Sequence, residues 1–182
     1  MQDWWQQVAI TAAAEFSDVP DPAQATRIVM RLCLAAMLGG LLGWEREANG
    51  KAAGVRTHML VCMGSAMFVM LALQTGAQVN EASRVVQGVI AGVGFLGAGT
   101  ILKEQVAGDG APQVRGLTTA AGIWLTAAIG VAAGLGEEAT ALLSALLAFG
   151  ILHLVPLLLS RTGRSSSPES SASESPSGDP EK

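Results

Sequence analysis

Charged side chains are scarce in this sequence of 182 residues, because Asp, Glu, Lys and Arg together make up only 14% of it. An average soluble domain carries about a quarter charged residues. Many of the acidic residues lie toward the two ends, as Asp3, Glu15 and Glu181 illustrate, so the net charge of −4 describes mainly the termini. A chain without a basic face gives no reason to expect nucleic acid as a partner.

The residue types that form metal and catalytic sites are also few. The chain has two cysteines and two histidines, and none of them has metal-ligand spacing. Cys33 and Cys62 both fall in apolar segments, where we expect them to be small buried side chains. No paired carboxylates and no Ser/His/Asp set stand out, so we expect no enzyme activity, no cofactor and no metal.

The N-terminus lacks the features of a signal peptide. Residues 1–5 have no basic stretch, and no apolar core follows before Pro20. Trp4, Trp5 and Phe16 instead favour a short amphipathic segment at a membrane surface, and we assign residues 1–26 to it.

The abundant feature is apolar sequence, at 50% of residues and a mean hydropathy of +0.41. It forms five stretches, approximately residues 28–44, 57–74, 85–102, 117–134 and 139–159. At a rise of 1.5 Å per residue each would give about 25–32 Å of helix, close to the ~30 Å hydrocarbon thickness of a bilayer. The sequence therefore predicts an all-α, polytopic membrane bundle of about five transmembrane helices within residues 27–160.

Basic residues in the short loops predict the orientation of this bundle. They fall in the first loop, in the third loop and at the start of the tail, namely Arg46, Lys51, Arg56, Lys103, Arg115, Arg161 and Arg164. The positive-inside rule then places these loops and the C-terminus in the cytoplasm, and the N-terminus outside. Arg27 and Arg31, at the outer end of the first span, oppose this assignment mildly. The Ser-, Pro- and Glu-rich residues 161–182 predict a disordered cytoplasmic tail.

Small residues recur at helical spacing, which favours close helix packing in lipid. In the first span Gly39 and Gly43 share one face with Ala35, and Arg46 continues that face. The third span has two small faces, one with Gly88, Gly92 and Gly99 and the other with Gly94 and Gly97. We therefore expect the third span to be sandwiched between neighbours or bent. Residues 92–97 also match G-x-G-x-x-G, but within an apolar run this pattern does not indicate nucleotide binding.

Ionisable residues at the membrane edges are the functional candidates. Glu45, Arg46, Arg56 and Thr57 would meet on the cytoplasmic side, either as a structural ion-pair latch or as a polar cavity or regulatory contact. The same two alternatives apply to Glu81 and Arg84 on the outer side. Arg115, Thr118 and Thr119 begin the fourth span, where the threonine hydroxyls can bond back to helix carbonyls.

Several of these segments together resemble the MgtC/SapB family of bacterial inner-membrane proteins. The matching motifs occur in the family's order, at residues 39–47, 54–57, 83–84, 92–99 and 115–121, followed by Trp124. The resemblance covers the transmembrane region, without the soluble C-terminal domain that some members carry. Relatives often have a proline before the Ser83-Arg84 pair, where this chain has Ala82.

The resemblance implies a multi-pass protein of the bacterial plasma membrane with about five spans. For such proteins it implies a regulatory or accessory role in magnesium limitation or stress adaptation, including restraint of the F-type ATP synthase. A small transporter or channel for magnesium or another cation is the alternative, and a structural scaffold is the third. Besides the lipid bilayer, other membrane proteins and further copies of the chain remain open as partners.

Overall fold

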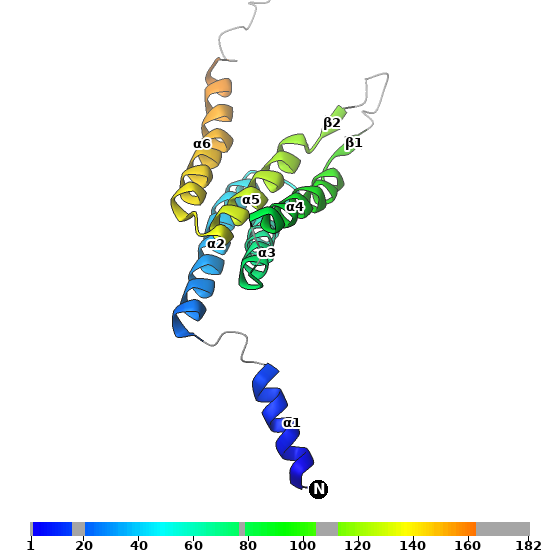
Figure 1. Cartoon of the computed structure of the whole chain (residues 1–182). Coiled ribbons are helices and arrows are strands. Elements are labelled where there is room, and N and C mark those ends of the chain that lie inside the picture. The colour runs from blue at the N-terminus through cyan, green and yellow to red at the C-terminus, as the bar shows by residue number, and fades with distance from the viewer. Residues whose placement is uncertain (1, 16–20, 77–78, 105–112, 163–182) are drawn as a thin grey trace, which may run out of the picture.

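The computed structural model describes residues 2–15, 21–76, 79–104 and 113–162 (Figure 1). Its elements in chain order are α1 Gln2–Glu15, α2 Pro22–Ala48, α3 Val55–Gln74, α4 Val79–Gly99, β1 Leu102–Glu104, β2 Gln113–Arg115, α5 Leu117–Leu135 and α6 Glu138–Thr162. Helices α2 to α6 are long and apolar enough to cross a membrane. The predicted all-α bundle of five membrane-spanning helices is therefore confirmed.

Local sequence explains where the first spanning helix begins and ends. The Asp21 carboxylate accepts a hydrogen bond from the Ala23 amide at 3.0 Å, and Pro22 occupies the first helical position, where its missing N–H costs nothing. At the other end the Asn49 amide donates to the Glu45 carbonyl, and Gly50 takes a φ of 64°. Helix α2 therefore begins at Pro22, before the apolar stretch that predicted this span from residue 28.

A short β-hairpin follows α4, and the sequence did not predict it. We expected helix as far as residue 102, but the helix ends at Gly99 and Leu102–Glu104 pairs antiparallel with Gln113–Arg115. Gly116 closes the hairpin with a φ of 95°, and a methyl group there would collide with the Thr100 carbonyl oxygen. Only glycine lets the two segments approach this closely before α5 begins.

Helix α3 packs between α2 and α5, and α5 in turn contacts each of the other four spanning helices. From α2, Gly39 approaches the His58 carbonyl so closely that an added methyl carbon would lie 2.6 Å from its oxygen. From α5, Gly130 and Gly134 lie equally close to the backbone at Cys62 and Ala66. Because lipid gives helices no hydrophobic reason to associate, such close backbone contact stabilises the bundle through van der Waals packing.

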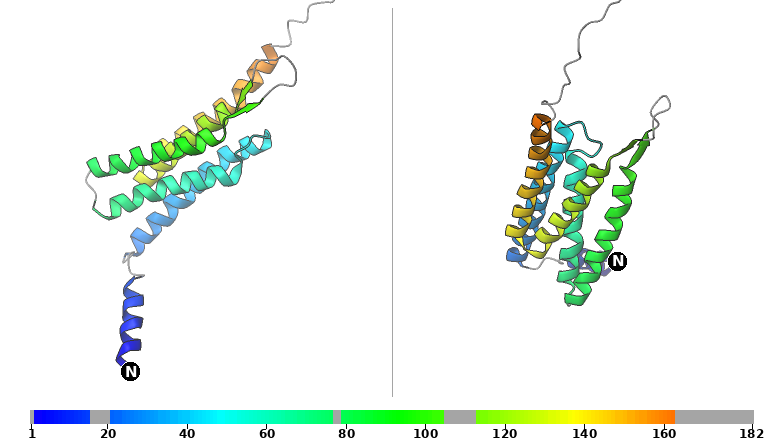
Figure 2. Two further views of the ribbon diagram at one scale, coloured as in Figure 1. Left: turned by 90° about the vertical axis from the view of Figure 1, so that its right-hand side faces the viewer. Right: turned by 90° about the horizontal axis from the view of Figure 1, so that it is seen from above.

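Helix α4 lies at the edge of the bundle (Figure 2), and here the packing prediction is wrong for a single chain. A methyl group added at Gly88, Gly92, Gly94 or Gly99 would meet nothing within 4 Å among the described residues. Gly97 alone of the predicted set on α4 faces another helix, at 3.5 Å from the Ala120 Cβ. Small residues permit close packing, but they do not by themselves supply the neighbour.

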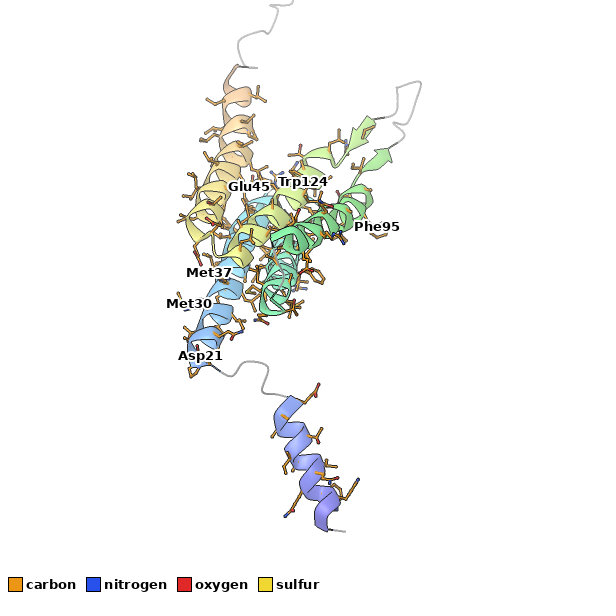
Figure 3. The ribbon with its side chains drawn as sticks, viewed as in Figure 1. Asp21, Met30, Met37, Glu45, Phe95 and Trp124 are labelled. Carbon is orange, nitrogen blue, oxygen red and sulfur yellow. The ribbon has the colours of Figure 1, made fainter. Side chains whose placement is uncertain are left out.

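Apolar side chains cover the outside of the bundle. Met30 and Met37 on α2 and Phe95 on α4 point away from the other helices (Figure 3), and Phe95 is 82% exposed. Cys62 is buried as expected, whereas Cys33 is exposed, which corrects the prediction that both cysteines are buried. An outer surface of this kind suits acyl chains better than water.

Helix α1 is separate from the five spanning helices (Figure 1). Helix α1 carries Trp4 and Trp5, whose rings meet edge to face with centroids 4.2 Å apart. In Figure 1 this helix stands apart from the bundle, and its place at a membrane surface stays a prediction. The predicted disordered tail lies outside the described residues from residue 163 onward.

Candidate functional site

Glu45 and Arg46 form a buried ion pair at the C-terminal end of α2. Each residue is only 3% exposed. Arg46 donates from Nε to Glu45 Oε2 at 2.6 Å and from Nη2 to Oε1 at 3.1 Å (Figure 3 labels Glu45). This two-bond arrangement is among the strongest that a guanidinium and a carboxylate can make.

Asn49 completes the surroundings of the Glu45 carboxylate. Its side-chain amide donates to Glu45 Oε1 and to the Glu45 carbonyl oxygen, both at 2.8 Å. The carboxylate is thereby satisfied, but Arg46 Nη1 is buried without a partner among the described residues. Burying two charges costs more than their attraction returns unless such hydrogen bonds are made, so the pair depends on Asn49.

The position of Arg46 follows from helix periodicity and confirms the prediction that it points along the packed face. Gly43, one turn earlier, lies so close to α3 that an added methyl carbon would be 2.6 Å from the Val55 Cα. Arg46 continues this face, and helical side chains lean toward the N-terminus of their own helix. Its guanidinium is therefore directed into the bundle instead of toward lipid.

Glu47 has a different task from its neighbours, because it holds the loop to the next helix. Its Oε2 accepts from the Val55 amide at 2.9 Å, at the start of α3. A carboxylate is favourable there because the first amides of a helix have no partner within it. Gly54 precedes this amide, and a methyl group on it would collide with the Glu47 carboxylate.

His58 is a buried polar residue that the sequence analysis missed. It is fully buried, and its Nδ1 lies 3.0 Å from the Gly54 carbonyl oxygen. A carbonyl only accepts, so Nδ1 donates and Nε2 is left as an acceptor. Nε2 is buried and has no partner among the described residues. Helix periodicity could have indicated that His58 is buried, since it lies one turn before Cys62 and two turns before Ala66 on the same helix face.

The other predicted residues at this end of the bundle are mostly exposed. Thr119 is buried, whereas Arg56 and Thr57 at the start of α3, Arg115 at the end of β2 and Thr118 at the start of α5 are exposed. The structure thus separates one predicted cluster into a buried, self-paired part and an exposed part.

At the opposite end, Glu81 and Arg84 are exposed on α4. A better-defined contact there involves Arg31, which the sequence analysis counted only against the orientation. Arg31 Nη1 donates to the Gly134 carbonyl at 2.9 Å, and its Nε lies 3.8 Å from Glu138 Oε1. A cation at the C-terminus of α5 is stabilised by the carbonyls that the helix leaves unpaired there. Arg31 therefore has a structural reason to occupy this end.

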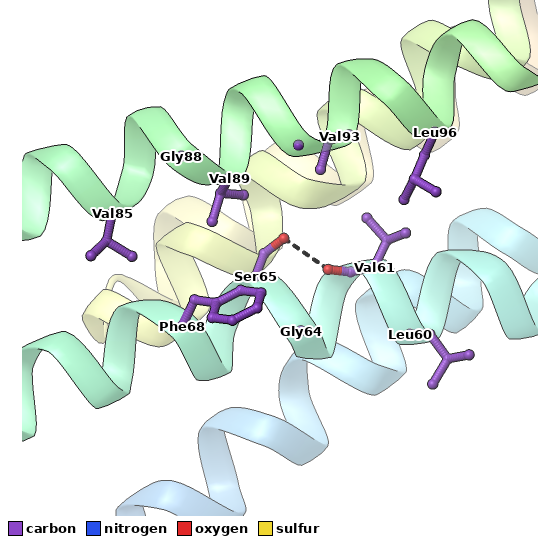
Figure 4. Close-up of a pocket in the computed structure, with 11 residues that line it drawn as sticks. Leu60, Val61, Gly64, Ser65, Phe68, Val85, Gly88, Val89, Val93 and Leu96 are labelled. Carbon is purple, nitrogen blue, oxygen red and sulfur yellow. Dashed lines mark hydrogen bonds between the residues drawn. The ribbon is translucent and has the colours of Figure 1, made fainter.

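A long apolar groove of about 650 Å³ runs between α3 and α4 (Figure 4). Gly88 and Gly92 form part of its wall on α4. Its one hydroxyl, on Ser65, donates to the Val61 carbonyl of its own helix at 2.8 Å, as the dashed line marks. A groove with this lining offers a surface for acyl chains and no polar chemistry.

These features define a polytopic α-helical membrane protein with a buried polar cluster at one end of its helices. The family model for the MgtC family matches residues 32–161, and the chain belongs to that family. No solved structure matches it.

Three curated relatives are similar to this chain over part of their length. Protein SrpB of Synechococcus elongatus is 51% identical over 113 residues, which cover 58% of this chain and 62% of the relative. The putative magnesium transporter YhiD of Escherichia coli is 44% identical over 115 residues, covering 59% and 51%. Protein MgtC of Salmonella typhimurium is 40% identical over 114 residues, covering 63% and 46%. The chain thus spans about half the length of the relatives it matches.

Proposed function

We propose that this MgtC-family chain is a non-catalytic membrane protein that acts on other membrane complexes during magnesium limitation or stress. Its location would be the inner membrane of a bacterium. The observation that carries the proposal is the division of the charges at one end of the bundle. Glu45 and Arg46 neutralise each other inside it, whereas Arg56 and Arg115 remain exposed at the same end.

The buried charges suit a structural role better than an ion pathway. Both carboxylate oxygens of Glu45 already accept hydrogen bonds from Arg46, and Oε1 accepts one from Asn49 as well. A magnesium ion needs several oxygen ligands and gives up its water reluctantly. Among the residues that the structure describes, no group of three or more His, Cys, Asp or Glu side chains could hold a metal.

The exposed residues suit contact with a partner protein. Arg56 and Thr57 begin α3, and Arg115 and Thr118 flank the start of α5, so all four are presented at one end. Arginine is enriched at protein interfaces because its planar group makes several directed hydrogen bonds. The partner that the family resemblance implies is the F-type ATP synthase.

A small cation transporter is the second candidate, since one relative is named a putative magnesium transporter. Purified protein in liposomes separates the two functions. Magnesium flux that disappears in an Arg46→Ala variant would contradict the regulatory proposal. Copurification with ATP synthase from membranes, without flux, would contradict transport.

Growth of a deletion strain in low magnesium tests whether the exposed residues act. We expect the wild-type chain to restore growth and the double variant Arg56→Ala/Arg115→Ala to fail although it accumulates normally. Trp44→Ala, a change of another exposed residue near the same end, is the matched control and should restore growth. Full rescue by the double variant would overturn the role of these two arginines.

A further inference from the structure

A second cavity lies inside the bundle, in the same end as the Glu45–Arg46 pair. Its volume is about 160 Å³, and residues of α2, α3, α5 and α6 line it. Its floor is buried and consists of Leu42, His58 and Ala148, whereas Thr118 and Ile151 at its mouth are exposed. The cavity is therefore a crevice that opens between α5 and α6.

The unpartnered nitrogen of His58 faces this crevice. Gly122 lines it, and a methyl group on Gly122 would lie 3.7 Å from His58 Nε2. The opposite ring nitrogen is held by the Gly54 carbonyl, which fixes the ring and leaves Nε2 as a hydrogen-bond acceptor. An acceptor buried without a donor costs about 1–3 kcal/mol, so an occupant with a donor would be stabilised here.

The rest of the lining determines what kind of molecule carries that donor. Apart from His58 and Thr118, the lining side chains are all apolar or absent, and they include the half-buried Leu125 and Leu152. The mouth lies between two membrane-spanning helices, so a ligand would arrive from the bilayer. The volume corresponds to roughly five water-sized groups at ~30 Å³ each, enough for a head group and a few carbons but not for a two-chain lipid.

We propose that this crevice binds the head of a single-chain amphiphile that carries an O–H group, with the O–H donating to His58 Nε2. The first carbons of the chain lie against the apolar wall, and the remainder leaves between α5 and α6 into the bilayer. Fatty alcohols and protonated fatty acids share this chemistry.

Nitrogen NMR of isotope-labelled histidine in the full-length protein, held in nanodiscs, tests the proposal. The chain has two histidines, and His153 is exposed on α6, so its signal is an internal reference. Decanol and decanoic acid should each move the His58 Nε2 signal saturably, whereas methyl decanoate, which lacks the O–H, should not. An imidazolium signal with decanoic acid alone would identify the acid as the ligand.

Filling the crevice should weaken binding while His58 itself is left unchanged. Gly122→Val places methyl groups in front of Nε2, and losing this hydrogen bond should weaken binding of decanol by about five- to tenfold. Gly150→Val is the matched control, because a side chain there meets nothing within 4 Å among the described residues, and it should bind as wild type.

Three results would overturn the proposal. One is a His58 signal that responds to neither probe, which leaves water as the occupant. The second is an equal response to methyl decanoate, and the third is unchanged binding in a folded Gly122→Val variant.

Discussion

At the scale of single residues, the Glu45–Arg46 pair shows how a membrane protein retains buried charge. The two groups are adjacent in sequence, yet they pair within one helix end because both are turned into the bundle and each is 3% exposed. Removing one partner would leave the other as an isolated buried charge, whereas removing both would leave only a packing change.

Arg46→Ala should therefore lower the free energy of unfolding by about 3–5 kcal/mol. The double variant Glu45→Gln/Arg46→Met should lose clearly less than Arg46→Ala alone, because no uncompensated charge remains. Thermal unfolding in a mild detergent measures both. Arg56→Ala, an exposed arginine in the neighbouring motif, should stay within about 0.5 kcal/mol of wild type. Equal losses for the single and double variants would contradict the ion-pair account.

At the scale of helices, identical glycine patterns lead to opposite packing. Gly130 on α5 lies against the carbonyl of Cys62, whereas Gly88 on α4 has nothing within 4 Å among the described residues. The contact, and not the residue type, decides whether a glycine is needed at that position.

Substitution by alanine should have opposite signs at these two glycines. Gly130→Ala forces α5 away from α3, and overpacking of this kind costs about 1–3 kcal/mol. Gly88→Ala should be neutral or stabilise the protein by up to ~1 kcal/mol, because alanine favours helix over glycine. Chemical denaturation of the two purified variants measures these changes in the free energy of unfolding. Equal destabilisation would contradict the prediction, because it would mean that Gly88 is packed against another helix.

The hairpin between α4 and α5 depends on one backbone conformation. Gly116 has a φ of 95° and lies against the Thr100 carbonyl. Gly116→Ala should therefore destabilise the junction by at least ~1–2 kcal/mol, from the left-handed conformation alone. Faster proteolysis of the variant at residues 101–116 than of wild type would show this loosening. Gly94→Ala is the control, because the added methyl group meets nothing within 4 Å in the part of the chain that the structure describes.

At the scale of the whole molecule, the five spans place the α2–α3 loop, the hairpin and the end of α6 together, away from the α5–α6 turn (Figure 2). Which of these ends faces the cytoplasm is a prediction from the basic loops. The contact of Arg31 with the end of α5 accounts for one of the two arginines that oppose this orientation, because Arg31 has a structural partner there.

Accessibility of introduced cysteines tests the orientation. With a membrane-impermeant maleimide, Glu137→Cys in the α5–α6 turn should be labelled in intact cells. Lys51→Cys in the α2–α3 loop should be labelled only after the cells are permeabilised. The parent chain gives the background labelling, since its Cys33 lies within α2 and its Cys62 within α3, inside membrane-spanning helices. The reverse pattern would invert the assigned topology.

Comparison of sequence and structure separates local from non-local information. The five spans could be predicted because the length of an apolar run is a local property of the sequence, and the thickness of the bilayer sets the length that a spanning helix needs. The inward direction of Arg46 could also be predicted, since helix periodicity places it on the face of Gly39 and Gly43. Whether the α4 glycines contact another helix could not be predicted, because small residues allow a close neighbour without specifying one.

The sequence by itself determined that this is a membrane bundle, which family motifs it carries and which end concentrates its polar residues. Tertiary structure alone decided that α3 packs between α2 and α5 whereas α4 is peripheral, that Arg56 is exposed, and that His58 faces a crevice. The physical reason is that burial depends on which helices lie side by side. In lipid that choice depends on close contact between surfaces far apart in the sequence, such as Gly39 and Gly130 on either side of α3.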